Sequence, residues 1–285
     1  MTSRFSSVIG KVASTAAVVV AVGAMSGSAA AAPLNQFTIA PRSLVALNPA
    51  GTPLSYPNNP PGVVVDRADG NYSEQLIITG PGTFTTTAFM QFGQYDLSGA
   101  VVDGSTLTGL AQGNGYNMYA LFNATGTFST DGSGTTTFTA TSGSTTLYVD
   151  PRNAITSFNT SNTPSFGTRT NFGDDQILAT ATLLSGNGSE NPSLNPPQQG
   201  SFGLVFNPTV LTALGASYFV QPVPFYITAD LNGVFDPFAL PIPPATAVVS
   251  GSGNLFFAPQ VVPEPASLTL LGLGLLGVAR RRFRA

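Results

Sequence analysis

Residues Thr83–Phe92 read Thr-Phe-Thr-Thr-Thr-Ala-Phe-Met-Gln-Phe, and this stretch decides the fold. Four apolar residues in it share one parity: Phe84, Ala88, Met90 and Phe92. Threonines hold the odd positions 83, 85 and 87. Because successive side chains of a β-strand point to opposite faces, this spacing predicts a strand with one buried face. Phe89 is the exception, an aromatic residue on the polar face.

The same alternation recurs along the chain, in the segments Thr145–Asp150, Ile177–Leu183 and Phe225–Asp230. Further strands are expected at Gln36–Ala40, at a sheet edge, and at Thr246–Phe257. Short Gly-containing segments predict turns between strands: Ala68–Asn71, Val102–Gly104, Gln112–Gly115, Thr130–Gly132, Gly186–Gly188 and Leu231–Gly233. Only Pro208–Ala216 resembles a helix, of one or two turns. We therefore predict an all-β domain, a β-sandwich or jelly-roll-like fold of roughly 10 to 14 strands.

The composition of the 285 residues excludes several classes of function. The charged fraction is 8%, and between Ala32 and Val262 four arginines face twelve acids, a charge of about −8 without a lysine. A basic footprint for nucleic acid is therefore absent. The chain has no Cys and no His, which rules out disulfides, zinc–thiolate sites and a Ser-His-Asp triad.

Residues 1–31 have the pattern of a secretory signal peptide. Arg4 and Lys11 form a basic start, Val12–Met25 is apolar, and small residues follow up to Ala32. Cleavage is expected after Ala31, because Pro33 is unfavourable directly after the cut. The alternative is an N-terminal helix that is retained.

The last 23 residues combine three features in a fixed order. Pro263-Glu264-Pro265 comes first, the apolar run Ala266–Ala279 second, and the basic end Arg280, Arg281, Arg282 and Arg284 third. Fourteen helical residues would cover about 21 Å, less than the roughly 30 Å of a bilayer's hydrocarbon. We expect a short, transient inner-membrane anchor, with the arginines on the cytoplasmic side.

Triplet, apolar run and basic end together resemble the PEP-CTERM sorting signal. In that family a membrane-embedded protease-transpeptidase, exosortase, recognises the signal and removes the tail of exported proteins in Gram-negative bacteria that make exopolysaccharide. The resemblance implies recognition through Pro263, Glu264 and Pro265, insertion of Leu268–Val278, and stop-transfer by Arg280, Arg281 and Arg282. The alternative is an ordinary membrane anchor with a coincidental Pro-Glu-Pro.

The predicted organisation has four parts: a signal peptide at 1–31, an extracellular β domain at 32–257, a linker at 258–262 and the sorting signal at 263–285. Several segments within the β domain also resemble the flocculation-associated PEP-CTERM proteins of floc-forming bacteria: Asn35–Thr38, Leu147–Pro151, Asp174–Thr180, Gly200–Gly203 and Tyr218–Tyr226. That resemblance implies a secreted surface protein that helps exopolysaccharide to hold cells together. It carries over no functional residue.

Two groups of acids are candidates for a metal site. Asp66, Asp69, Asn71 and Glu74 place four oxygen-bearing side chains around a Gly-containing turn, and calcium takes 6 to 8 oxygen ligands. Their spacing fits no EF-hand, so a solvated turn is the competing interpretation. Asp174-Asp175 can ligate a cation or cap the start of a strand. We therefore expect no cofactor, with calcium as the alternative.

Catalysis and sugar binding have weaker signals. A glycosidase needs two carboxyl groups about 5 to 9.5 Å apart, and nothing in the sequence singles out a pair, Glu74 and Glu190 included. We therefore predict that the protein is not an enzyme. Tyr116, Tyr119 and Tyr226 are the candidates for stacking on sugars, although packing is the more usual role of such residues.

These observations predict an exported surface or matrix protein. The secretion translocon and exosortase are its expected processing partners, and exopolysaccharide is the partner with which it promotes cell aggregation in flocs or biofilm. The alternative is a carbohydrate-binding β-sandwich module, which calcium can assist. A hydrolase is the third hypothesis.

Overall fold

The computed structural model describes residues 35–41, 43–44, 62–102, 116–150, 156–191, 200–226, 228–235 and 245–258. The chain divides into two units, Met1–Pro33 and Leu34–Ala285, and all described residues belong to the second. The predicted signal peptide, linker and C-terminal tail lie outside the described residues, apart from Ala258 at the linker's start. No helix in the described ranges is long and apolar enough to cross a membrane.

The described part is 72% strand with almost no helix, which confirms the all-β prediction. The strands are β1 (Phe37–Ile39), β2 (Val63–Val65), β3 (Arg67–Gly80), β4 (Thr83–Leu97), β5 (Ala100–Val102), β6 (Asn117–Thr130), β7 (Thr136–Asp150), β8 (Ser157–Phe158), β9 (Arg169–Thr170), β10 (Gln176–Glu190), β11 (Gly200–Leu211), β12 (Phe219–Gln221), β13 (Thr228–Phe235) and β14 (Ala245–Ala258). One helix, α1 (Ala213–Tyr218), lies between β11 and β12.

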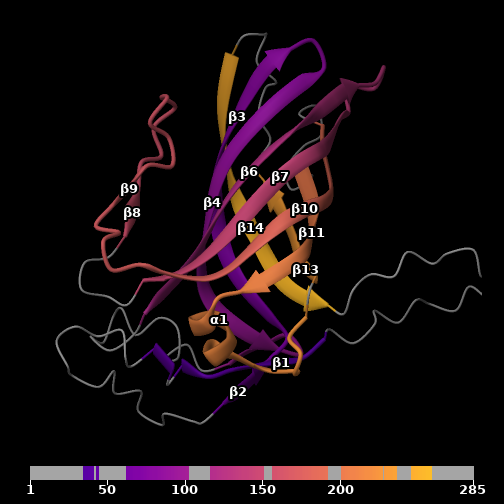
Figure 1. Cartoon of the computed structure of the whole chain (residues 1–285). Helices are drawn as coiled ribbons and strands as arrows, with labels where there is room; N and C mark the ends of the chain where they lie inside the picture. Colours follow the sequence, from indigo (N-terminus) through magenta and orange to yellow (C-terminus); the bar gives the residue numbers. More distant parts are fainter. Residues whose placement is uncertain are drawn as a thin grey trace, which may run out of the picture. The chain divides into compact units, whose positions relative to one another are not determined.

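Eight long strands form a closed antiparallel barrel (Figure 1). Their order is β3-β14-β13-β11-β10-β7-β6-β4, and β4 pairs again with β3, which closes the ring. The short β5 pairs antiparallel with the end of β4. The predicted sandwich or jelly roll is therefore wrong. A sandwich and a barrel both give strands with one buried face, so alternation along the chain does not distinguish them.

Strand β4 shows why the alternation predicts burial correctly. Its even residues from Phe84 to Phe92 are all buried in the barrel, whereas Thr83, Thr87 and Gln91 are exposed on the outside. The parity shifts after Phe92, where β4 has one residue more than its partner between Phe92 and Gln94, a β-bulge. After the bulge the odd-numbered Tyr95 is buried.

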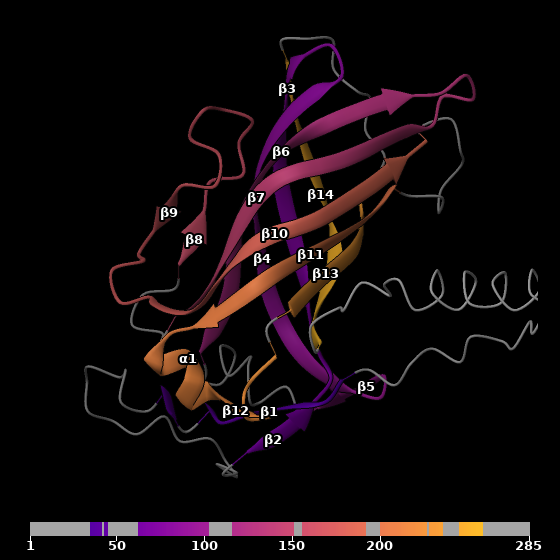
Figure 2. The ribbon, with the colours of Figure 1, turned by 45° about the vertical axis from the view of Figure 1, so that its right-hand side comes forward.

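The small sheet β12-β1-β2 lies at one end of the barrel (Figure 2). Aromatic side chains fill the core at this end. The ring of Phe37 has its centroid 5.1 Å from that of Phe257 and 6.1 Å from that of Phe219. Close by, the buried hydroxyl of Tyr218 lies 2.9 Å from that of Tyr95 and 2.5 Å from that of Tyr116. These contacts join the small sheet and α1 to the barrel in one core.

The structure confirms some of the predicted strands and turns and contradicts others. The strands expected at Gln36–Ala40 and Thr246–Phe257 are β1 and β14, and the turn at Thr130–Gly132 separates β6 from β7. The turns predicted at Ala68–Asn71, Gly186–Gly188 and Leu231–Gly233 are wrong, because these segments lie inside β3, β10 and β13. The helix begins later than expected: Pro208 belongs to β11, and Thr212 caps α1 by accepting a hydrogen bond from the Gly215 amide at 3.0 Å.

Candidate functional site

A long excursion from the barrel, between β7 and β10, builds the candidate site on the outer surface (Figure 2). It contains the hairpin β8–β9. Phe158 of β8 stacks on Phe89 of β4, with ring centroids 4.1 Å apart and ring planes 9° apart, and Phe166 packs on the same ring. The excursion is therefore attached to the barrel wall by aromatic contacts.

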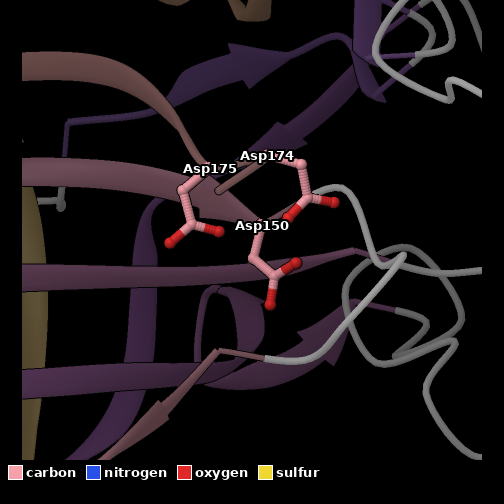
Figure 3. A group of neighbouring side chains, drawn as sticks. All are labelled: Asp150, Asp174 and Asp175. Atoms are coloured by element: carbon pink, nitrogen blue, oxygen red, sulfur yellow. The ribbon is translucent and has the colours of Figure 1, made fainter. Parts of the chain in front are cut away.

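Three carboxylates meet where the excursion rejoins the barrel: Asp150, Asp174 and Asp175 (Figure 3). Asp150 ends β7, and the other two precede β10. Because β7 and β10 are antiparallel neighbours with Val149 opposite Gln176, the end of one strand lies beside the start of the other. One oxygen from each of the three carboxylates lies within 4.8 Å of the others.

Asp150 is buried, the side chain of Asp175 is only 2% exposed, and both carboxylates accept hydrogen bonds. The Thr156 amide donates to Asp150 Oδ2 at 2.9 Å, and the Thr156 hydroxyl lies 2.9 and 3.0 Å from the two oxygens of Asp175. The hydroxyl of Tyr119 also donates to Asp175. Burial raises the pKa of Asp175 above its ordinary value, and the hydrogen bonds from Tyr119 and Thr156 oppose that rise.

An arginine and aromatic rings form the next layer. Arg169 Nη1 donates to the Tyr119 hydroxyl at 2.6 Å and lies 3.7 Å from Asp175 Oδ2. Its guanidinium carbon is 4.6 Å from the ring centroids of both Tyr148 and Phe172. Tyr119 and Tyr148 stack with centroids 5.0 Å apart. Burial and the hydrogen bond to Asp175 both raise the pKa of Tyr119, so this phenol stays protonated at neutral pH.

The arrangement suits two kinds of chemistry. Carboxylate oxygens are the ligands that calcium prefers, and clustered carboxylates can hold it if further oxygens complete the shell. Exposed aromatic and polar groups can stack on and hydrogen-bond to a sugar. Asp175 itself needs no metal ion to be satisfied, because Arg169 pairs with it and Tyr119 and Thr156 donate hydrogen bonds to its oxygens.

The structure does not bring the four calcium candidates Asp66, Asp69, Asn71 and Glu74 together. Asp69 and Asn71 lie on the outer face of β3, where Asn71 is exposed, whereas Glu74 faces the barrel interior. Asp69 instead pairs with Arg67, whose Nε lies 3.0 Å from Asp69 Oδ1. Asp66 accepts a hydrogen bond from the Ser98 amide at 2.5 Å. The predicted turn is replaced by continuous strand, which separates alternate side chains.

The three tyrosine candidates serve packing. Tyr116 and Tyr119 are 0% and 1% exposed, and Tyr226 donates its hydroxyl to the Gln36 carbonyl at 3.1 Å. Of the predicted cation ligands, Asp174 and Asp175 do lie together, and the structure adds Asp150 and Arg169. Sequence reasoning missed these two because only the pairing of β7 with β10 and the path of the excursion bring them close.

The predicted sorting residues Pro263, Glu264, Pro265, Arg280, Arg281 and Arg282, and the cleavage site at Ala31, lie outside the described residues. Comparison with known proteins bears on the tail. Residues 261–284 match the PEP-CTERM protein-sorting motif. No curated protein and no solved structure matches the chain. The motif implies a secreted protein that an exosortase processes and that is sorted to the surface of a Gram-negative bacterium.

Proposed function

We propose that this chain, with its exosortase-processed PEP-CTERM tail, is a surface or matrix protein that promotes cell aggregation together with exopolysaccharide. The secretion translocon exports it, the tail anchors it transiently in the inner membrane, and exosortase releases the barrel into the matrix. The role is structural and not catalytic, in keeping with a chain that has no His and no Cys. One observation carries the proposal: the sorting motif begins at residue 261, directly after the last barrel strand ends at Ala258.

The first test replaces Pro263, Glu264 and Pro265 by alanine in the chromosomal gene. Immunoblots of membrane and medium fractions should then show a full-length, membrane-bound form, because the processing enzyme no longer recognises the tail. The matched control is Pro259→Ala, which lies outside the motif and should be processed normally. Normal processing of the triple variant would refute the sorting role.

The role in aggregation is tested by the settling of cells that lack the gene. These cells should settle more slowly than the parent strain, and unchanged settling would refute the aggregation role.

The second candidate function is carbohydrate binding assisted by calcium. The convergence of Asp150, Asp174 and Asp175 close to the exposed ring of Phe172 favours it. Here the protein should bind the host's own polysaccharide in a pull-down, and EDTA should abolish binding that added calcium restores. Saturable binding that EDTA leaves unchanged would show that carbohydrate binding does not need calcium. Absence of binding would favour a matrix component that self-associates.

A further inference from the structure

The inward faces of the barrel strands line a cavity that the surface role does not use. All eight barrel strands contribute to its lining, so it lies inside the ring. Phe84, Phe138, Phe202 and Leu204 form much of its wall. The cavity offers about 80 Å³ to the centres of water-sized molecules, whereas a single water needs about 10–15 Å³ on this measure. The barrel therefore has room for a small organic molecule.

Small residues on the wall maintain this space. Ala124, Ala140, Gly186 and Gly188 line the cavity from β6, β7 and β10. A Cβ atom at Gly186 would lie 2.6 Å from Leu204 Cδ2, so even alanine would crowd that side of the wall. The interior of an eight-stranded barrel is either filled by side chains or holds one small ligand. Because small residues line this part of the barrel, we infer that it holds a ligand.

Glu74 is the acidic group in a lining that is mainly apolar, with Thr86 and Asn187 as its other polar residues. Its Oε1 accepts a hydrogen bond from the Thr86 hydroxyl at 2.5 Å, and its second oxygen has no hydrogen-bond partner among the described residues. Burial raises the pKa of Glu74. Within the described ranges the only basic side chains are Arg67 and Arg169, and each pairs with another acid. A carboxyl group buried without a cation is costly, and such groups gather at binding sites.

The chemistry of the lining selects the ligand. A protonated amine supplies a cation for Glu74 and a hydrogen-bond donor for its second oxygen. Phenylalanine rings attract cations through their faces and pack against apolar groups. Glu190, also buried, lies on β10 two residues beyond Gly188 and therefore on the same inward face. Two acids on the inward face of the barrel disfavour an anionic ligand.

We propose that the barrel interior binds a small organic amine, with the ammonium group paired to Glu74 and the apolar body packed among the phenylalanines. This site is independent of the sorting tail and of the outer carboxylate cluster. Pairing with an ammonium group favours the ionised form of Glu74, so binding replaces an uncompensated buried acid by an ion pair. The interaction requires charge on the ligand as well as an apolar body.

The test titrates the processed protein, recovered from the cell surface, with three ligands of similar shape in a calorimeter. These are phenethylamine, 2-phenylethanol and 3-phenylpropanoic acid. We expect saturable 1:1 binding of the amine, binding of the alcohol at least tenfold weaker, and no binding of the acid. This experiment uses the unaltered protein. The proposal would be overturned if the amine failed to bind or if the amine and the acid bound equally well.

Variants then locate the site. Glu74→Gln keeps the side-chain shape and removes the charge, so amine affinity should fall at least tenfold while alcohol affinity stays the same. Asp131→Asn removes a charge from an exposed turn and should leave both affinities unchanged. Ala140→Leu fills the cavity and should weaken both ligands. Unchanged amine affinity in a folded Glu74→Gln protein would overturn the assignment to Glu74.

Discussion

Phe89 faces away from the barrel interior and is nevertheless only 4% exposed. Phe158 stacks on its ring from outside, and Phe166 covers it further. Its place on the polar face of β4 is thus explained by the excursion between β7 and β10, which covers this part of the wall. The residue has a structural partner that lies far away in sequence.

Replacing Phe89 by alanine should lower the free energy of unfolding by about 3 kcal/mol, because a large buried ring is lost and a cavity remains between wall and excursion. Urea denaturation measures the change. The control is Gln91→Ala, an exposed position on the same face of β4, where a change within about 0.5 kcal/mol is expected. Limited proteolysis should also cleave the excursion faster in the Phe89 variant. Equal stability of the two variants would show that the stacked rings do not hold the excursion.

The residues of the candidate site differ in how far the sequence alone predicts their role. Adjacent acids at Asp174 and Asp175 are visible as a candidate cation pair. In the sequence Asp150 is only the polar last residue of an alternating strand pattern, and no motif around Arg169 points to a functional role. Their roles follow from the pairing of Val149 with Gln176 across two strands, and from the route of the chain between them. Such long-range pairing is not encoded in local spacing.

Alternation of apolar and polar residues predicted the buried faces of the strands well, whereas glycine-containing turn motifs predicted turns inside strands. Gly70 and Gly233 follow Asp and Asn, a pairing typical of tight turns, yet both lie inside barrel strands. A Cβ atom at Gly70 would lie 2.2 Å from the Gln91 carbonyl oxygen, and one at Gly233 would lie 2.4 Å from that of Ser252. These glycines let neighbouring backbones approach closely in a strongly curved sheet. Glycine is typical both of a tight turn and of a strand position where a neighbouring backbone comes close. Only the position of the partner strand shows which of the two applies.

Closure of the barrel depends on β3. It pairs with β14 on one side and with β4 on the other, so the first and last barrel strands meet. Closure removes the exposed edges that an open sheet would have and creates an interior that Glu74 faces. The sequence predicted strands with one buried face but not their closure, because closure depends on which strands become neighbours.

Burial of acids predicts how the stability of the whole protein depends on pH. Burial raises the pKa of Glu74 from 4.5, and it also raises those of Asp69, Asp175 and Asp230. A carboxyl group with a raised folded pKa binds more protons in the folded state than in the unfolded state. Stability therefore falls as the pH rises from the unfolded value, about 4.5 for Glu74, through the folded value. The melting temperature should accordingly be higher near pH 5 than at pH 7.

Thermal unfolding followed by circular dichroism between pH 4.5 and 8 measures this dependence. Glu74→Gln should flatten the profile and raise the melting temperature at pH 7, because the neutral amide avoids the cost of burying a charge. Asp131→Asn is the matched control. Hydrogen bonds from Ser133 and Thr135 lower the pKa of Asp131, so the stability that this group contributes is lost only below about pH 4, outside the measured range. A profile that Glu74→Gln leaves unaltered would mean that the carboxyl group is solvated in the folded protein, which would also remove the electrostatic basis of amine binding in the barrel.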